Sequence, residues 1–242
     1  MKTVIIVQAR MGSSRLPGKV LLDLAGEPML VRVVNRLRRT PANEVVIATT
    51  KNPADDQIEE LCAQREIACF RGSENDVLDR YYQAARQHAA DIIVRVTSDC
   101  PVVDPGLTSR LIHEFCERLP DIDCASTVLP VRTYPRGLDA EAFNFDVLEK
   151  LWRNDQSPVG REHVTPYVHR NLNQFRVHGI TNTVDCSYQR WTVDTPEDFD
   201  LIGRIYAAFR HDRFSWQEVL SLLEEHPDWL EINSHVEQKV MA

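Results

Sequence analysis

Cationic and small side chains follow directly on the first apolar run of the chain. Behind a short β-prone run at residues 4–7 comes a loop that contains Arg10, Gly12, Ser13, Ser14, Arg15, Gly18 and Lys19. Glycines let the backbone come close to a ligand and turn its N–H groups outward. Arginines hold oxyanions through two parallel hydrogen bonds, and lysine adds a compact positive charge. The pattern predicts a polyanion-binding loop, and a nucleoside triphosphate is the polyanion that it favours.

Two aspartates are placed to assist such a ligand. Asp99 directly follows one apolar strand candidate, and Asp194 follows another. Carboxylate and phosphate oxygens are ligands that magnesium prefers. An aspartate at a strand end is, however, more often a turn former, and an acid is also favourable near a helix N-terminus such as the one that Thr195 opens. Because Thr195 can itself cap that helix, Asp194 is available for another role.

Length and charge limit the function classes. The 242 residues suffice for one large α/β domain, or for one domain with a small appendage. The net charge is −8, but residues 1–40 carry +6 and the remainder −14, which suits a small anionic ligand and argues against a general nucleic-acid binder. Six cysteines without a C-x-x-C pair indicate reduced thiols in a cytoplasmic protein. We find neither a signal-peptide pattern nor an apolar run of membrane-spanning length.

Strand and helix patterns alternate through the first half of the chain. Strands are predicted at residues 3–8, 44–50, 67–71, 91–97, 121–127, 139–145, 175–183 and 189–193. The alternation indicates an α/β fold with three layers, in which a mostly parallel central sheet has helices on both faces. The second half is expected to be smaller, mixed and β-rich. Ligands on such sheets bind beyond the carboxyl ends of the strands, where the cationic loop and Asp99 both fall.

Local capping patterns predict where helices begin. The predicted caps are Ser73 or Asn75, Asp104, Thr195 with Asp198, and Ser215 with Glu218. Pro105 and Pro196 each follow a cap, at the first helical position, where proline is favoured. A short helix is predicted at residues 161–171. Asp104 is also a weaker candidate for binding a second ion.

Neither common nucleotide-binding motif is present. A kinase-type phosphate loop requires G-x-x-x-x-G-K-[ST]. Here five residues separate Gly12 from Gly18, and Val20 rather than a hydroxyl residue follows Lys19. The dinucleotide fingerprint G-x-G-x-x-G is also absent.

The loop instead resembles the opening motif of the sugar-acid cytidylyltransferases, A-R-x-x-S-x-R-x-P-G-K. These are the CMP-KDO and CMP-sialate synthetases and the spore-coat polysaccharide F branch. Residues 9–19 match the motif position by position, and residues 26–30, GEPML, continue the match. The resemblance implies a Rossmann-like, nucleotide-diphospho-sugar-transferase-like fold, CTP as the nucleotide, Mg²⁺ as the cofactor and a homodimer. The catalytic residues that it implies are Arg10, Arg15, Lys19 and Asp99, and its nucleotide site adds Gln8, Ala9, Gly12, Ser13, Ser14 and Thr97.

Two further segments resemble metal-binding parts of the same family. Residues 95–101, RVTSDCP, resemble its G-D-x-P segment. Residues 193–198, VDTPED, resemble its V-D-T-P-E-D segment, whose aspartate binds magnesium there. The resemblance therefore pairs Asp99 with Asp194 as the metal ligands.

Three other segments resemble the spore-coat branch in particular. Residues 71–81 imply nucleotide contacts by Arg71, Asp76 and Arg80. Equally, Asp76 can start a helix, and the two arginines can pair with acids. Segments at 136–143 and 161–167 imply acceptor contacts by Arg136, Glu141, Arg161 and His163, although a lone histidine on a helix is more often structural. The regions that bind the sugar in the KDO and sialate enzymes are not recognisable, so neither sugar is assumed.

The resulting hypothesis is a magnesium-dependent nucleotidyltransferase that moves CMP from CTP to an anionic acceptor, such as a sugar acid, in polysaccharide or surface-glycan precursor synthesis. One alternative is a metal-dependent glycosyltransferase, because Asp121-Ile122-Asp123 has the D-x-D form. Another is a non-catalytic nucleotide-binding protein. We expect one domain over residues 1–242, with a nucleotide-binding part at 1–120, an acceptor-binding and dimerisation part at 121–195 and C-terminal helices at 196–242. No membrane or nucleic-acid partner is expected.

Overall fold

The first strand shows how the chain builds its sheet. In the computed structural model, which describes residues 1–238, β1 (Thr3–Gln8) is an apolar strand buried on both faces. Ile5 and Val7 lie in one core and Val4 and Ile6 in the other, because successive side chains of a strand point to opposite faces. Such double burial is typical of parallel sheets.

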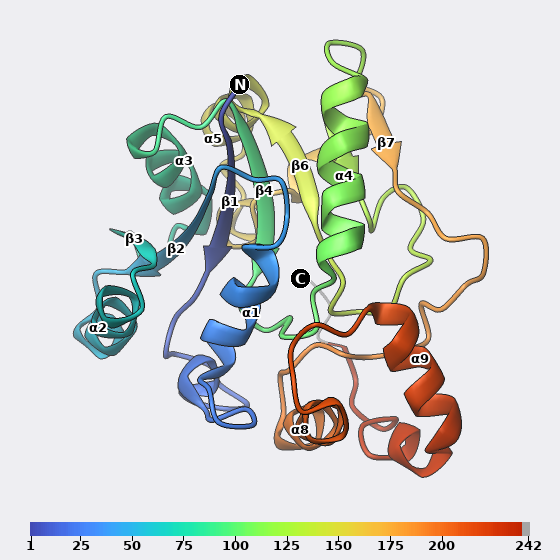
Figure 1. Cartoon of the computed structure of the whole chain (residues 1–242). Coiled ribbons are helices and arrows are strands. Elements are labelled where there is room, and N and C mark those ends of the chain that lie inside the picture. The colour runs from blue at the N-terminus through green and yellow to red at the C-terminus, as the bar shows by residue number, and fades with distance from the viewer. Residues whose placement is uncertain (239–242) are drawn as a thin grey trace.

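Within residues 1–238 the strands form one seven-stranded sheet in the order β3-β2-β1-β4-β6-β5-β7 (Figure 1). The first four are parallel: β3 (Ala68–Gly72), β2 (Glu44–Thr50), β1 and β4 (Ile92–Thr97). Next comes β6 (Glu141–Asn144), which is antiparallel to both of its neighbours, β4 and β5 (Cys124–Ser126). The edge strand β7 (Val177–Gly179) runs parallel to β5. The predicted α/β fold with a mostly parallel sheet is confirmed.

Helices cover both faces of the sheet and so form two separate cores. One face carries α1 (Met29–Leu37), α2 (Asp56–Gln64) and α4 (Pro105–Glu117), and α8 (Pro196–Phe209) and α9 (Trp216–Glu225) extend the same core. The other face carries α3 (Val77–Gln87), α5 (Phe145–Asn154), α6 (Pro158–His163) and α7 (Pro166–Arg170). Short 3₁₀ turns are η1 (Lys19–Leu21), η2 (Pro53–Asp55) and η3 (Pro227–Glu231). The predicted three layers are therefore present.

Two sequence predictions about secondary structure were wrong, and a third was right only in one of its alternatives. The segment at 189–193 is not a strand of the sheet, because Arg190 makes only an isolated bridge with Arg136. The helix predicted at 161–171 is divided into α6 and α7, since Val164 adopts a positive φ of 73° and Pro166 has no N–H to continue the helix. The cap of α3 is Asp76, the alternative helix start that the sequence also offered, and not Ser73 or Asn75.

Other helix starts agree with the sequence. Thr195 with Asp198, and Ser215 with Glu218, form complete capping boxes at α8 and α9. Asp104 caps α4 through Leu107 N at 2.7 Å and also accepts from Trp216 N at 2.9 Å. Residues 239–242, the end of the expected C-terminal part, lie outside the described residues. Within residues 1–238, none of the helices combines the length and the apolarity that crossing a lipid bilayer requires.

Candidate active site

The cationic loop after β1 is closed on itself and anchored to the body of the protein. The backbone N–H of Gly18 donates to the carbonyl of Met11 at 3.0 Å, and Met11 N donates to Asp55 Oδ1 at 2.7 Å. Gly18 has a φ of 69°, in the left-handed region that favours glycine. Gly12 has no such constraint, and a Cβ there would meet no atom within 4 Å. The loop geometry thus depends on Gly18 and places Lys19 at the start of η1.

The ammonium group of Lys19 lies between two aspartates from distant segments. Lys19 Nζ is 3.2 Å from Asp99 Oδ2 and 2.9 Å from Asp194 Oδ1, and it donates to the carbonyl of Val193 at 2.7 Å. Its side chain is only 11% exposed. Burial lowers the pKa of Lys19, but the two carboxylates more than offset this effect and leave the pKa above its ordinary value. Lys19 is therefore a charged, buried bridge between the acids that the sequence paired.

Backbone contacts bring these two aspartates together. Asp99 follows β4, and its own carbonyl accepts hydrogen bonds from Val193 N at 2.8 Å and Thr192 Oγ1 at 3.2 Å. Thr97 Oγ1 donates to Asp99 Oδ1 at 2.5 Å and so orients the carboxylate. The segment before Asp194 is thus joined to the loop after β4, which explains why it is extended without belonging to the sheet.

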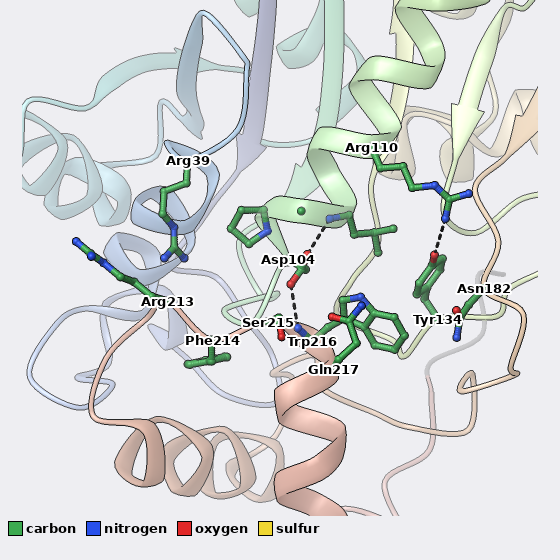
Figure 2. A pocket seen from close by; sticks show the side chains of 13 residues that line it. Arg39, Asp104, Arg110, Tyr134, Asn182, Arg213, Phe214, Ser215, Trp216 and Gln217 are labelled. Carbon is green, nitrogen blue, oxygen red and sulfur yellow. Dashed lines mark hydrogen bonds between the residues drawn. The ribbon is translucent and has the colours of Figure 1, made fainter.

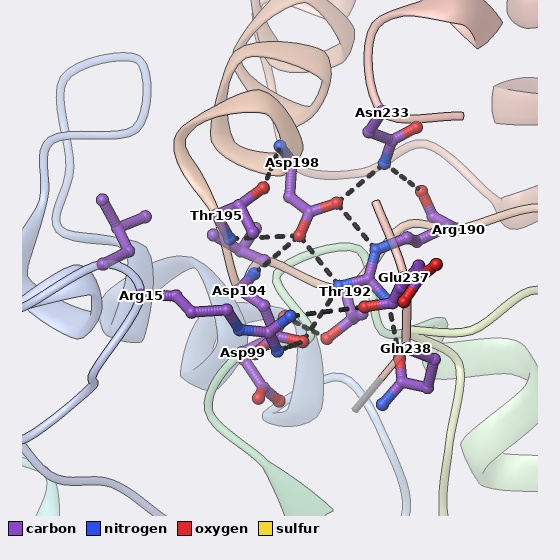
Figure 3. A network of polar contacts seen from close by, with 12 residues as sticks. Arg15, Asp99, Arg190, Thr192, Asp194, Thr195, Asp198, Asn233, Glu237 and Gln238 are labelled. Carbon is purple, nitrogen blue, oxygen red and sulfur yellow. Dashed lines mark hydrogen bonds and ion pairs between the residues drawn. The ribbon is translucent and has the colours of Figure 1, made fainter. Parts of the chain in front are cut away.

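Among the described residues, three cations lie around the carboxylate of Asp194. Figure 3 shows two of them, Arg15 and Arg190. Lys19 contacts Oδ1, whereas Arg15 Nη2 and Arg190 Nη2 each lie 3.0 Å from Oδ2. Burial raises the pKa of Asp194, but Lys19, Arg15 and Arg190 together bring it below its ordinary value. Asp194 is therefore an anion in the folded protein.

Sequence reasoning missed the group that holds Arg190. Its guanidinium binds the fully buried carboxylate of Asp198 through Nε at 2.8 Å and Nη2 at 2.9 Å. Asn233 Nδ2 donates both to Asp198 Oδ1 at 2.9 Å and to the carbonyl of Arg190 at 3.0 Å. The sequence offered one sign of the contact between Arg190 and Asp194, namely that the two residues lie four positions apart. Nothing local pointed to Asn233, which lies in the polar C-terminal segment.

The residues present fit a divalent cation. Two ionisable carboxylates converge on one positively charged atom, and phosphate oxygens and waters commonly complete the octahedron that magnesium requires. Within the described part of the chain, no group of three or more histidines, cysteines and acids is assembled for a metal. A cation at this place would therefore rest on Asp99 and Asp194 together with oxygens of a bound ligand.

The residues expected at the nucleotide base lie at the end of β1. The side-chain Oε1 of Gln8 is buried and has no hydrogen-bond partner among the described residues. Ala9 is buried, and its N–H donates to the carbonyl of Ala48 at 3.2 Å. Arg10 is 46% exposed and lies 3.8 Å from Glu162, so it is loosely held. Ser13 and Ser14 lie on the outer part of the loop, where Ser13 Oγ accepts from Leu16 N at 3.4 Å.

The predicted contacts from the third strand and helix are mostly engaged elsewhere. Arg71 pairs with Asp56 at 2.7 Å and Glu59 at 2.8 Å, the alternative that the sequence left open. Asp76 caps α3 and binds Arg161, whose Nε lies 2.9 Å from Asp76 Oδ2. The remaining residue, Arg80, is buried and donates to the carbonyl of Ser73. Its Nε has no hydrogen-bond partner among the residues that the structure describes.

Among the predicted acceptor residues, Arg136 is the one beside the aspartate cluster. It lines a cavity of about 320 Å³ together with Arg190, Tyr188 and Gln238. No hydrogen bond or ion pair of its guanidinium occurs within residues 1–238. Burial lowers the pKa of Arg136, and the nearby charge of Arg132 adds to this effect.

The other predicted acceptor residues are built into the framework. Glu141 is buried and binds Arg95 at 3.0 Å, Thr165 at 2.8 Å and His169 at 3.2 Å. Burial opposes the ionisation of Glu141, but His169, Arg95 and Thr165 lower its pKa to about 2. His163 ends α6. Both carboxylate oxygens of Glu141 are therefore held by framework residues, Oε2 by Arg95 and Thr165 and Oε1 by His169.

A larger cavity of about 470 Å³ lies between the starts of α4 and α9 (Figure 2). Asp104 joins the two helices at its floor, and Arg39, Arg110 and Arg213 lie around it. Arg39 and Arg110 are engaged with Asp212 and Glu114. Apart from Asp104, the weaker candidate for a second ion, whose two carboxylate oxygens accept backbone N–H bonds, none of the predicted site residues lines this cavity. Its size therefore does not identify the active site.

The D-x-D segment is remote from the aspartate cluster. Asp123 pairs with Arg176 at 2.9 Å. Asp123 precedes β5, whereas Asp99 follows β4, and these two strands run in the same direction. The two aspartates therefore lie at opposite ends of the strands. This placement does not favour a glycosyltransferase metal site.

Comparisons with known proteins place the chain in one family. A family model described as Cytidylyltransferase matches residues 4–228. The spore coat polysaccharide biosynthesis protein SpsF of Bacillus subtilis is 34% identical over 238 residues, covering 93% of this chain and 95% of that protein. A solved cytidylyltransferase from Leptospira borgpetersenii has a TM-score of 0.92 at 34% identity and covers 100% of both chains. A CMP:2-keto-3-deoxy-manno-octonic acid synthetase has a TM-score of 0.66 at 21% identity, covers 86% of this chain and 99% of its own, and shares the fold.

The resemblance read from the loop at 9–19 and from the segments around Asp99 and Asp194 is thereby confirmed at the level of the family. The match extends over nearly the whole chain and not only over the loop. The chain belongs to the cytidylyltransferase family and is a nucleotidyltransferase.

Proposed function

We propose that this chain transfers CMP from CTP to a small anionic acceptor, with magnesium as the cofactor and pyrophosphate as the second product. One observation carries the proposal: the buried ammonium of Lys19 joins Asp99 and Asp194, and Arg15 lies beside them at the carboxyl ends of the strands. The site combines carboxylates for a divalent cation with cations for a triphosphate. Neither set alone would suit a metal–nucleotide complex.

CTP as the nucleotide is supported by the family and by the end of β1. The synthetase that shares this fold was solved in complex with CTP. In this chain the buried Oε1 of Gln8, which has no partner among residues 1–238, offers an acceptor for an exocyclic amine. Cytosine carries such an amine and uracil does not, so a hydrogen bond to Gln8 would favour CTP over UTP. We assign the base to Gln8 and the backbone around Ala9.

The proposed reaction needs positioning and charge neutralisation more than covalent help from the protein. An oxygen of the acceptor attacks the α-phosphorus, the bond from that phosphorus to the bridging oxygen of the β-phosphate breaks, and the acceptor proton passes to solvent. Arg10, Arg15 and Lys19 neutralise the triphosphate and the leaving pyrophosphate. In doing so, Arg15 and Lys19 exchange a carboxylate partner for phosphate oxygens. Because Arg15 lies 3.0 Å from Asp194 and Lys19 lies within 3.2 Å of both acids, phosphate oxygens bound beside the acids can be reached without a large movement of the loop.

Asp99 and Asp194 would hold the magnesium ion, which when bound would neutralise phosphate charge and lower the pKa of an acceptor hydroxyl. Thr97 fixes the orientation of Asp99, and the bonds from Thr192 and Val193 fix the distance between the two acids. These contacts make the acids a preformed pair. A preformed pair costs little reorganisation when the ligand binds.

The acceptor site that we propose is the cavity of about 320 Å³ beside Arg190. Arg136 supplies a half-buried guanidinium there that has no partner within residues 1–238, which suits a carboxylate or phosphate on the acceptor. Tyr188 is 75% exposed and offers a flat apolar surface at the same cavity. The volume suits a small molecule of sugar-acid size rather than a polymer.

The proposal is tested by pyrophosphate release from each nucleoside triphosphate with magnesium and a panel of sugar acids and phosphorylated small molecules. We expect release with CTP and an anionic acceptor, and a CMP adduct detectable by mass spectrometry. Release with UTP at an equal rate would contradict the base assignment. Release of a nucleotide from a nucleotide-sugar, without pyrophosphate, would contradict the reaction class.

A further inference from the structure

The three cations around Asp194 differ in how firmly they are held. Arg15 and Lys19 belong to the loop that we assign to the triphosphate, and the Arg15 side chain is 34% exposed. Arg190 comes from the segment that leads to Asp194 itself, and its side chain is only 9% exposed. Two of the three partners of Asp194 are thus needed elsewhere when nucleotide binds, whereas the third is not.

Arg190 is fixed from its far side. The carboxylate of Asp198 binds Nε and Nη2 of Arg190 and is itself fully buried. The same carboxylate accepts from the backbone N–H groups of Asp194 at 2.9 Å and Thr195 at 3.1 Å. Asn233 completes the arrangement by binding both Asp198 and the carbonyl of Arg190 (Figure 3). We call Arg190, Asp198 and Asn233 the Arg190 clamp.

We propose that Arg190 is a positioning residue, which holds the Asp194 carboxylate in the orientation that the divalent cation requires. This inference rests on the proposed function. When Lys19 and Arg15 turn toward phosphate, Arg190 Nη2 is the remaining contact that fixes Asp194 Oδ2. Oδ1, which now faces Lys19, is then the oxygen presented to the cation. Partners that orient a ligating carboxylate in this way contribute strongly to metal affinity.

The guanidinium fork is essential to this role. One edge of the Arg190 guanidinium, Nε and Nη2, donates two parallel hydrogen bonds to Asp198, and Nη2 also donates to Asp194 Oδ2. A lysine at this position keeps the charge but has a single ammonium group, which cannot maintain both contacts with the same geometry. Arg190→Lys therefore removes orientation while leaving the charge balance of the buried acids unchanged.

The test measures how much magnesium strengthens CTP binding. CTP dissociation constants are determined by calorimetry with EDTA and with saturating magnesium, without acceptor, so that no turnover occurs. The matched control is Arg204→Lys, because Arg204 makes an exposed pair with Asp200 on α8. Melting temperatures of all variants are recorded in parallel to detect a purely structural effect.

We expect Arg190→Lys to reduce the increase in CTP affinity caused by magnesium about tenfold. CTP affinity in EDTA should stay near wild type, and Arg204→Lys should behave like the wild type under both conditions. Asn233→Ala loosens the Arg190 clamp but leaves both side chains of the Arg190–Asp194 ion pair in place, so we expect a smaller reduction, of about threefold. Unchanged strengthening in folded Arg190→Lys overturns the inference, and if that variant does not fold, unchanged strengthening in Asn233→Ala does so. A wild-type protein that binds no CTP under either condition contradicts the proposed function instead.

Discussion

Replacement of Lys19 by methionine separates the two roles that we assign to this residue. The change keeps most of the apolar stem and removes the ammonium that joins Asp99, Asp194 and the carbonyl of Val193. Hydrogen bonds to charged groups contribute about 1.5–3 kcal/mol each. Asp194 retains Arg15 and Arg190, and Asp99 is 27% exposed, so the acids are not left fully unpaired. We therefore expect a net loss of about 2 kcal/mol in the free energy of unfolding, less than the 3–5 kcal/mol of a fully broken buried pair.

The same variant is expected to respond to magnesium in a way that the wild type does not. Without the ammonium, two carboxylates face one another, and a divalent cation can take its place. At a magnesium concentration ten times the dissociation constant, binding to the folded state alone adds about 1.4 kcal/mol to the free energy of unfolding. Turnover is nevertheless expected to fall at least about a hundredfold, because the triphosphate loses a preorganised charge.

Urea unfolding with and without magnesium measures the loss of stability and the stabilisation by magnesium, and pyrophosphate release measures turnover. Lys51→Met, at an exposed position, is the control for loss of a lysine. The wild type should show little stabilisation by magnesium without nucleotide, since Lys19 already neutralises the acids. Lys19→Met that is as stable as the wild type, and equally insensitive to magnesium, would refute the account of the site.

Three further predictions concern the acids and the acceptor. Asp194→Asn removes one of the two carboxylates that we propose as metal ligands, and we expect the magnesium concentration for half-maximal pyrophosphate release to rise about tenfold or more. An unchanged magnesium requirement would show that Asp194 is not a ligand. Arg136→Ala is expected to raise the acceptor KM about tenfold or more and to leave the CTP KM unchanged, and the opposite pattern would place Arg136 at the nucleotide. Glu141 has a pKa of about 2 in the folded protein against 4.5 unfolded, so its stabilising contribution is present above pH 4.5 and is lost as the pH falls toward 2. That shift corresponds to about 3 kcal/mol of stability. In urea titrations, the free energy of unfolding of Glu141→Gln should therefore fall less steeply between pH 4.5 and pH 2 than that of the wild type. An equally steep fall would assign the acid sensitivity to other groups.

The sequence was most informative where the structure depends on neighbours along the chain. The strands at 3–8 and 44–50 were predicted with the bounds that the structure shows, because both are apolar runs ended by polar residues. The capping boxes at Thr195 and Ser215 were likewise readable from residues three positions apart. The strand predicted at 189–193 was wrong, because the extended backbone there forms a hydrogen bond from Val193 N to the carbonyl of Asp99 and does not pair with a strand of the sheet.

The residues that we propose for the active site divide in the same way. The motif at 9–19 located Arg15 and Lys19, and the strand-end positions located Asp99 and Asp194. The sequence could not show that Arg71 pairs with the acids of α2 or that Asp76 holds Arg161, since each of those side chains has other possible partners. Nor could it show that the guanidinium of Arg161 is engaged with Trp152 whereas that of Arg136 has no partner in the part of the chain that the structure describes.

The local pattern of residues alone determined the α/β class, the phosphate-type loop and the family. Only the tertiary structure decided that Lys19 would meet Asp194, 175 positions further along the chain, and that Arg190 would be clamped by Asp198 and Asn233. The physical reason is that charge-assisted bonds of this kind are strong only where burial and fixed geometry exclude water. Burial and geometry at a given side chain arise from the packing of the whole sheet, its helices and the C-terminal segment, not from the residues next to it in sequence.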